Sequence, residues 1–195
     1  MTFFKKNLSL ISKLFINQIG MTIFGIVLTM AVNMAAKGKS VFLLCVSLFA
    51  VLFYLALIYS VMWEVGARDI LRIESGKQEK VPFFALKASL FASVPNFFLA
   101  LLMLLGFLLG YVWDLSFGVL LYGITHIFVG LFESMYAGCF SVILDTFAYD
   151  PFIEYLVATL LYIFSSLPMI LVSVGAYELG KRNVYLLGKK KQKAE

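Results

Sequence analysis

Long runs of hydrophobic residues, each broken by few charges, make up most of the chain. Five runs are long enough to form membrane-crossing helices, and they cover residues 14–36, 41–63, 82–113, 115–135 and 152–180. An apolar helix needs about 20 residues to cross a hydrocarbon layer of about 30 Å. The stretch "YAGCFSVILDTFA", which begins at Tyr136, is too short and too polar to be a further crossing. The pattern therefore predicts an all-α, polytopic helical bundle in a membrane.

The composition supports this fold class. Of the 195 residues, 62% are hydrophobic and only 14% are charged, whereas an average soluble domain has about 25% charged residues. A water-soluble fold of this length could not bury so much apolar surface. We expect a single helical membrane domain over residues 1–195, placed in the cytoplasmic membrane of a bacterium.

The distribution of Lys and Arg decides how many times the chain crosses. Three of these cations lie in residues 5–13, five in residues 68–87 and six in residues 181–193, which leaves only Lys37 and Lys39 elsewhere. Cytoplasmic segments of membrane proteins carry an excess of Lys and Arg. An even number of crossings places all three basic segments on that side, whereas five crossings divide them. We therefore expect both termini in the cytoplasm.

An even number of crossings constrains residues 114–151, which hold no Lys or Arg but carry Asp114, Glu133, Asp145 and Asp150. This segment must leave the outer face and return to it. It forms either a re-entrant hairpin or two thin spans that meet near Glu133. The prediction is four firm transmembrane helices plus this hairpin, which allows 4–6 spans. Irregular backbone at membrane depth must be covered by protein or by a water-filled cavity.

Two proline-containing stretches mark a candidate solute site. "LFASVPNFF" at residues 90–98 and "IFSSLPMIL" at residues 163–171 both place Ser two residues before Pro, inside hydrophobic runs that run in opposite directions. Interrupted helices in oppositely oriented segments indicate the midplane site of a transporter. Ser93, Asn96 and Ser166 are the predicted substrate-binding residues. The alternative is that Pro95 and Pro168 are ordinary kinks that shape the bundle.

Three further residues suggest a proton relay. Tyr122, His126 and Glu133 share one face if the helix is continuous, since they are spaced by four and then seven residues. His126 and Glu133 would then lie about 10 Å apart along the axis, so water would have to join them. The alternative is a histidine bonded to a neighbouring helix and a glutamate at the outer interface.

The segments on the predicted cytoplasmic side offer contacts with partners and lipids. Residues 64–81 carry Glu64 and Arg68 four apart and Asp69 and Arg72 three apart, spacings that pair charges on a helix. Arg68, Asp69 and Arg72 could dock a cytoplasmic protein, or residues 64–81 could simply be a solvated continuation of the preceding helix. Residues 1–13 form an amphipathic lead-in or an extension of the first span, and the basic tail 181–195 can contact anionic lipid headgroups.

The expected function follows from what the sequence contains. It lacks the nucleophile, zinc-binding and nucleotide-binding motifs of common enzymes, so we expect no catalysis, no cofactor, no metal site and no nucleic-acid partner. "GFLLG" at residues 106–110 predicts close helix packing within the chain. The leading hypothesis is a small-solute transporter, or a membrane subunit of a transport complex. The alternative is a non-catalytic assembly or regulatory protein that docks a partner through residues 64–81. The oligomeric state stays open.

Overall fold

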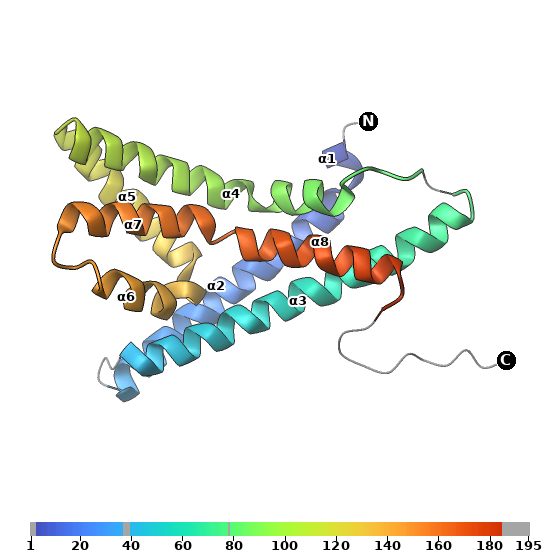
Figure 1. The fold of residues 1–195 in the computed structure, drawn as a ribbon, viewed down its shortest axis with the longest axis horizontal. Helices are drawn as coiled ribbons and strands as arrows, with labels where there is room; N and C mark the ends of the chain where they lie inside the picture. The colour runs from blue at the N-terminus through green and yellow to red at the C-terminus, as the bar shows by residue number, and fades with distance from the viewer. Residues whose placement is uncertain (1–2, 37–39, 78, 185–195) are drawn as a thin grey trace.

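The computed structural model describes residues 3–36, 40–77 and 79–184, and every regular element in these ranges is a helix (Figure 1). The elements are α1 (Phe3–Lys6), α2 (Leu8–Ala36), α3 (Ser40–Glu74), α4 (Phe84–Phe107), the π-helix η1 (Leu108–Val112), α5 (Ser116–Phe132), the 3₁₀ helix η2 (Ser134–Tyr136), α6 (Ala137–Asp145), α7 (Pro151–Phe164) and α8 (Leu167–Lys181). Four stretches are long and apolar enough to cross a membrane: Leu8–Ala35, Val41–Glu74, Phe84–Val112 and Pro151–Lys181. The predicted all-α class and these four helices are confirmed.

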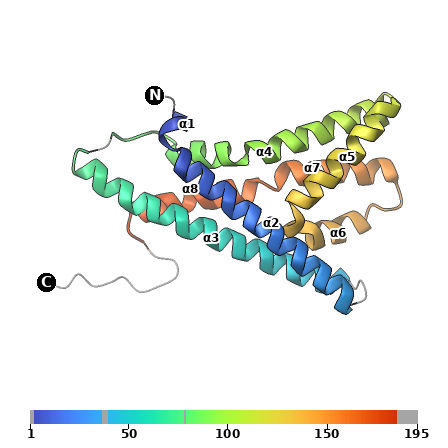
Figure 2. The same ribbon diagram turned by 180° about the vertical axis from the view of Figure 1, so that it is seen from behind.

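The segment between the third and fourth of these helices is a bent pair. Ser116–Phe132 and Ser134–Asp145 meet at an angle of 81°. In both views α5 runs from one end of the bundle to its middle, and α6 returns to the same end (Figures 1 and 2). The hydrophobic run predicted at residues 115–135 is the helix Ser116–Phe132, and the chain turns at Glu133, where the sequence predicted that the two arms of the segment meet.

The two ends of the bundle differ in charge. α1, the start of α2, the end of α3, the start of α4 and the end of α8 lie at one end (Figure 1). Every Lys and Arg among the described residues lies on or next to these segments, and we call this the basic end. Asp114, Asp145 and Asp150 lie at the opposite, acidic end. Lys37, Lys39 and the tail from residue 185 lie outside the described residues.

The interior of the bundle combines small, polar and large apolar residues, whereas many large apolar residues also face outward. Ala88, Ser89 and Ser93 on α4 are at most 2% exposed, whereas Ile23 on α2 and Leu101 on α4 are each 59% exposed. In water such a surface would be strongly unfavourable. In lipid it matches the surrounding hydrocarbon, while small inner residues let helix backbones approach closely.

The predicted G-x-x-x-G spacing lies at a close approach of two helices. A Cβ atom placed on Gly106 would lie 2.6 Å from the backbone nitrogen of Tyr122, and one on Gly110 would lie 2.5 Å from that of Val119. Gly118 on α5 faces the backbone of Gly110 in return. Only glycine fits where two backbones come this close. The prediction that this motif packs within the chain is confirmed.

The first long helix begins earlier than predicted, and the second continues past its predicted span. α2 begins at Leu8, so residues 8–13 belong to the first long helix and only Phe3–Lys6 form a separate lead-in. α3 continues to Glu74, as expected for a helical continuation of the second span. Its 35 residues correspond to about 50 Å, which exceeds the hydrocarbon thickness of about 30 Å.

The position of the helix ends predicts a labelling pattern. In a protein with Cys45 and Cys139 replaced by Ser, we expect an impermeant maleimide to label Asp114→Cys and Tyr149→Cys from the same side of the membrane. Ser75→Cys should react only from the opposite side, because it lies at the other end of the bundle. Labelling of Asp114→Cys and Tyr149→Cys from opposite sides would show that the bent pair crosses the membrane.

The glycine contacts predict a second, matched result. Gly118→Ala should lower the free energy of unfolding by about 1–3 kcal/mol, because the new methyl group has no space. Gly123→Ala on the same helix should change it by less than about 1 kcal/mol, since a Cβ atom placed on Gly123 would have no other atom within 4 Å. Unfolding in mixed micelles measures both, and equal effects would contradict the packing.

Candidate functional site

Two helical segments break in the interior of the bundle, and a third, α4, is continuous but contains a proline. α4 contains Pro95, α5 ends at Phe132 before η2, and α7 ends at Phe164 shortly before α8 begins at Leu167. The latter two breaks lie near the middle of the bundle's long axis (Figure 1). Helix ends leave backbone N–H and C=O groups without helical partners. In a membrane these groups need partners within the protein.

The bend at Glu133 receives such partners from the first two long helices. The Thr22 hydroxyl on α2 donates to the carbonyl of Phe132 at 2.7 Å, and the Ser134 hydroxyl donates to the carbonyl of Thr22, also at 2.7 Å. On the far side of the bend, the N–H of Gly138 donates to the Ser47 hydroxyl of α3 at 2.7 Å. The position of the bend is therefore fixed by α2 and α3.

A polar cluster connects the proline-containing turn of α4 to the two breaks. The side-chain amide of Asn96 donates to Glu133 Oε1 at 2.6 Å and to Ser166 Oγ at 3.4 Å. Ser93, one turn earlier on α4, donates to the Met169 sulfur at 3.7 Å. We call Ser93, Asn96, Glu133 and Ser166 the Asn96 cluster. All four are buried, with Glu133 only 3% exposed.

The cluster has unused hydrogen-bonding capacity. Within the described part of the chain, Asn96 Oδ1, Glu133 Oε2 and the Tyr136 hydroxyl are buried and have no hydrogen-bond partner. Glu133 also forms no salt bridge with a described residue. An ionised carboxylate buried without a cation costs several kcal/mol. The cluster is thus suited to bind a small polar or positively charged group, including a proton.

The N-terminus of α8 contributes a positive electrostatic potential, which stabilises negative charge near the Asn96 cluster. Ser166 is the N-cap residue of α8, and its hydroxyl accepts from the amide that also holds Glu133. The N-terminus of a helix carries a partial positive charge. The positive end of α8 therefore lies close to the Glu133 carboxyl group.

The structure separates the residues predicted to form a proton relay. The rings of Tyr122 and His126 are in contact, with centroids 5.7 Å apart. Because α5 ends at Phe132, the expectation that Glu133 continues their helical face is wrong. Glu133 instead joins Asn96, while His126 stays on α5 one turn before Gly130.

Tyr162 of α7 occupies the gap between His126 and Glu133. Its ring centroid lies 5.8 Å from that of His126. Its hydroxyl oxygen would be 3.3 Å from a Cβ placed on Gly130, which lies between His126 and Glu133 in the sequence. The sequence analysis missed this residue. The available signal was the four-residue spacing from Tyr162 to Ser166.

The residues predicted to dock a partner differ in exposure. Arg68 and Arg72 are exposed, and Arg68 lies 3.8 Å from Glu64, so the first predicted charge pair is present. Asp69 is only 6% exposed and accepts a hydrogen bond from the Tyr177 hydroxyl at 3.1 Å. The predicted pairing of Asp69 with Arg72 is wrong, because Asp69 points inward and joins α3 to α8.

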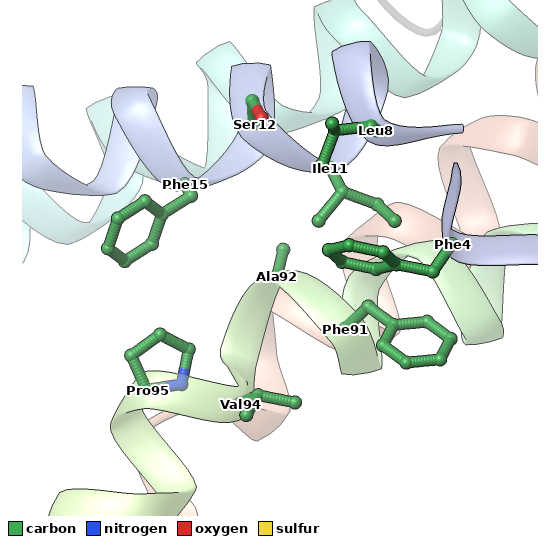
Figure 3. A pocket seen from close by; sticks show the side chains of 9 residues that line it. All are labelled: Phe4, Leu8, Ile11, Ser12, Phe15, Phe91, Ala92, Val94 and Pro95. Atoms are coloured by element: carbon green, nitrogen blue, oxygen red, sulfur yellow. The ribbon is translucent and has the colours of Figure 1, made fainter. Parts of the chain in front are cut away.

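A separate cavity of about 430 Å³ lies between the start of α2 and α4 (Figure 3). Its lining is almost entirely apolar, and it consists of Phe4, Leu8, Ile11, Ser12, Phe15, Phe91, Ala92, Val94 and Pro95. Pro95 borders this cavity while its neighbour Asn96 binds Glu133. The proline-containing turn therefore has one apolar side and one polar side.

Comparison of the chain with protein-family models, curated proteins and solved structures finds no match. The geometry of the chain itself is therefore the basis for interpreting the site.

The Asn96–Glu133 contact predicts energetic coupling. Asn96→Ala and Glu133→Ala should each destabilise the protein, and the double variant should lose about 1–2 kcal/mol less than the two losses added together. Unfolding in mixed micelles gives this coupling energy. As a control, Asn96→Ala combined with Asp145→Ala at the acidic end should be additive within about 0.5 kcal/mol. An additive Asn96/Glu133 pair would argue against the hydrogen bond.

Proposed function

We propose that this protein binds and moves a small solute across a membrane, alone or as the membrane subunit of a transport complex. The solute site is the Asn96 cluster. The observation that carries the proposal is the 2.6 Å contact between Asn96 and the buried Glu133, made where interrupted helices meet.

Two physical arguments support transport over a purely structural role. Ionisable residues inside a membrane are costly, and they commonly mark substrate or ion pathways. Discontinuous helices with half-helix N-termini directed at the midplane are typical of transporter binding sites. Here α4 runs opposite to α7 and α8 (Figure 1), and the proline-containing turn of α4 and the break before α8 contribute Asn96 and Ser166 to one cluster.

In the proposed orientation, the basic end faces the cytoplasm of a bacterium and both termini lie on that side. The bent pair of α5 and α6 is a re-entrant hairpin that enters from the outer face. This arrangement is supported by the charge difference between the ends and by the return of α6 to the end from which α5 began. Glu133 then lies at the innermost point of the hairpin.

The proposal includes proton coupling at Glu133. Tyr122, His126 and Tyr162 form a row of contacting rings that leads from the acidic end toward the bend. With water between their polar atoms, these side chains can pass a proton between the outer face and the Asn96 cluster. Binding and release of solute would change the hydrogen bonds of Glu133 and hence its affinity for the proton.

A second candidate function is docking of a cytoplasmic protein in an assembly or regulatory complex. It is favoured by the end of α3, where Arg68 and Arg72 are exposed and Leu71 is 66% exposed. Purification with native partners separates the two proposals. An associated ATPase supports a transport complex, whereas an envelope-assembly factor supports docking.

Liposomes containing the purified protein test the transport proposal. We expect one class among amino acids, amines, sugars and small carboxylates to give a current on a solid-supported membrane. Glu133→Gln should reduce that current at least tenfold, because it removes the ionisable group while preserving the shape of the side chain. Asp145→Asn, which changes an exposed acid of α6, should leave it unaltered. A current that persists in Glu133→Gln would exclude Glu133 as the coupling group.

A further inference from the structure

A hollow lined by several charged residues lies at the basic end, away from the Asn96 cluster. Its volume is about 210 Å³, which is ample for several polar atoms, since one water needs about 10–15 Å³. Lys6 and Asn7 border it from the start of the chain, Arg68 and Arg72 from α3, and Phe84 from α4. Segments far apart in the sequence thus build one recess.

The charge of this recess is predominantly positive. Arg68 and Arg72 are one helical turn apart on α3, and Lys6 faces them across the hollow. Asp69 also lines it, but one carboxylate oxygen already accepts from the Tyr177 hydroxyl at 3.1 Å. The contact of Arg68 with Glu64 is long, at 3.8 Å, and both side chains are more than half exposed. The guanidinium groups therefore remain accessible to an anion.

We propose that this recess binds the phosphate headgroup of an anionic phospholipid. Arginine forks match phosphate oxygens in pairs, and lysine adds a mobile positive charge. Basic pockets between transmembrane helices on the cytoplasmic side are suited to such headgroups. The proposal concerns the basic end alone and does not depend on solute transport.

The neighbouring surface favours a lipid over a soluble anion. Leu10, Val65 and Phe84 give the recess an apolar lining beside its cations, and Leu71, next to Arg72 on α3, is 66% exposed. A phospholipid satisfies both features, because its phosphate can enter the recess while its acyl chains cover the apolar side chains. A free phosphate would leave these side chains uncovered.

Native mass spectrometry of the full chain tests the proposal with phosphatidylglycerol as the probe and phosphatidylcholine as the neutral reference. We expect the parent protein to retain one phosphatidylglycerol in preference to phosphatidylcholine. Lys6→Gln, Arg68→Gln and Arg72→Gln combined should weaken that binding about tenfold or more, since each cation contributes about 1 kcal/mol.

The control replaces three other cations of the basic end, in Lys77→Gln, Lys80→Gln and Arg182→Gln. It removes the same total charge, so phosphatidylglycerol binding should stay within about twofold of the parent. An equal loss in both triple variants would overturn the proposal in favour of general attraction to the basic end.

Two further outcomes distinguish a phospholipid from other ligands. Displacement of phosphatidylglycerol by inorganic phosphate at equal concentration would assign the recess to a free anion and overturn the lipid proposal. Unchanged lipid binding in the first triple variant, together with loss of a co-purifying protein, would assign the surface to a protein partner instead. Thermal unfolding of all variants verifies that they fold, and the single variant Arg72→Gln, with an exposed side chain, provides a milder test if the triple variant does not.

Discussion

The arrangement of this protein depends on how the backbone around Glu133 obtains its hydrogen bonds. A helix that stops inside a membrane leaves polar groups that lipid cannot satisfy. The Thr22 hydroxyl donates to the Phe132 carbonyl, and the Thr22 carbonyl accepts from the Ser134 hydroxyl. The Ser47 hydroxyl accepts from the N–H of Gly138. Each of these three hydrogen bonds is short, at 2.7 Å. The long helices and the bent pair must therefore assemble together, because the bend has no satisfied state without α2 and α3.

The same constraint explains why the polar residues are concentrated in the interior. Small side chains on the inner face of α4 let neighbouring helices approach, and the larger apolar side chains face outward. Asn96 and Glu133 belong to these buried polar residues, and three of the buried atoms in this region have no partner among the described residues. Unpaired groups of this kind reduce stability. Their presence at the junction of interrupted helices is the strongest indication that the junction has a function.

The sequence predicted the long helices because a hydrophobic run of sufficient length has few alternatives to a transmembrane helix. The repeated Ser-x-Pro spacing also predicted that Ser93, Asn96 and Ser166 form one site, and the structure places Asn96 beside Ser166. The charge distribution predicted a turn near Glu133, but the contact of Glu133 with Asn96 could not be predicted, because it joins residues 37 positions apart. Asp69 was misread for a related reason: its pairing with Tyr177 joins residues 108 positions apart, whereas helical spacing reports only neighbours.

Glycine contacts hold several helix pairs at close backbone approach. Gly106, Gly110 and Gly118 join α4 to α5, Gly66 and Gly180 join α3 to α8, and Gly25 and Gly138 join the bent pair to α2 and α3. These pairs cannot slide past each other without a backbone clash. Relative movement of the helices is therefore easiest at two joints that carry none of these glycines, the proline-containing turn of α4 and the break before α8. Asn96 and Ser166 lie at those two joints, and their separation would be the first distance to change in such a movement.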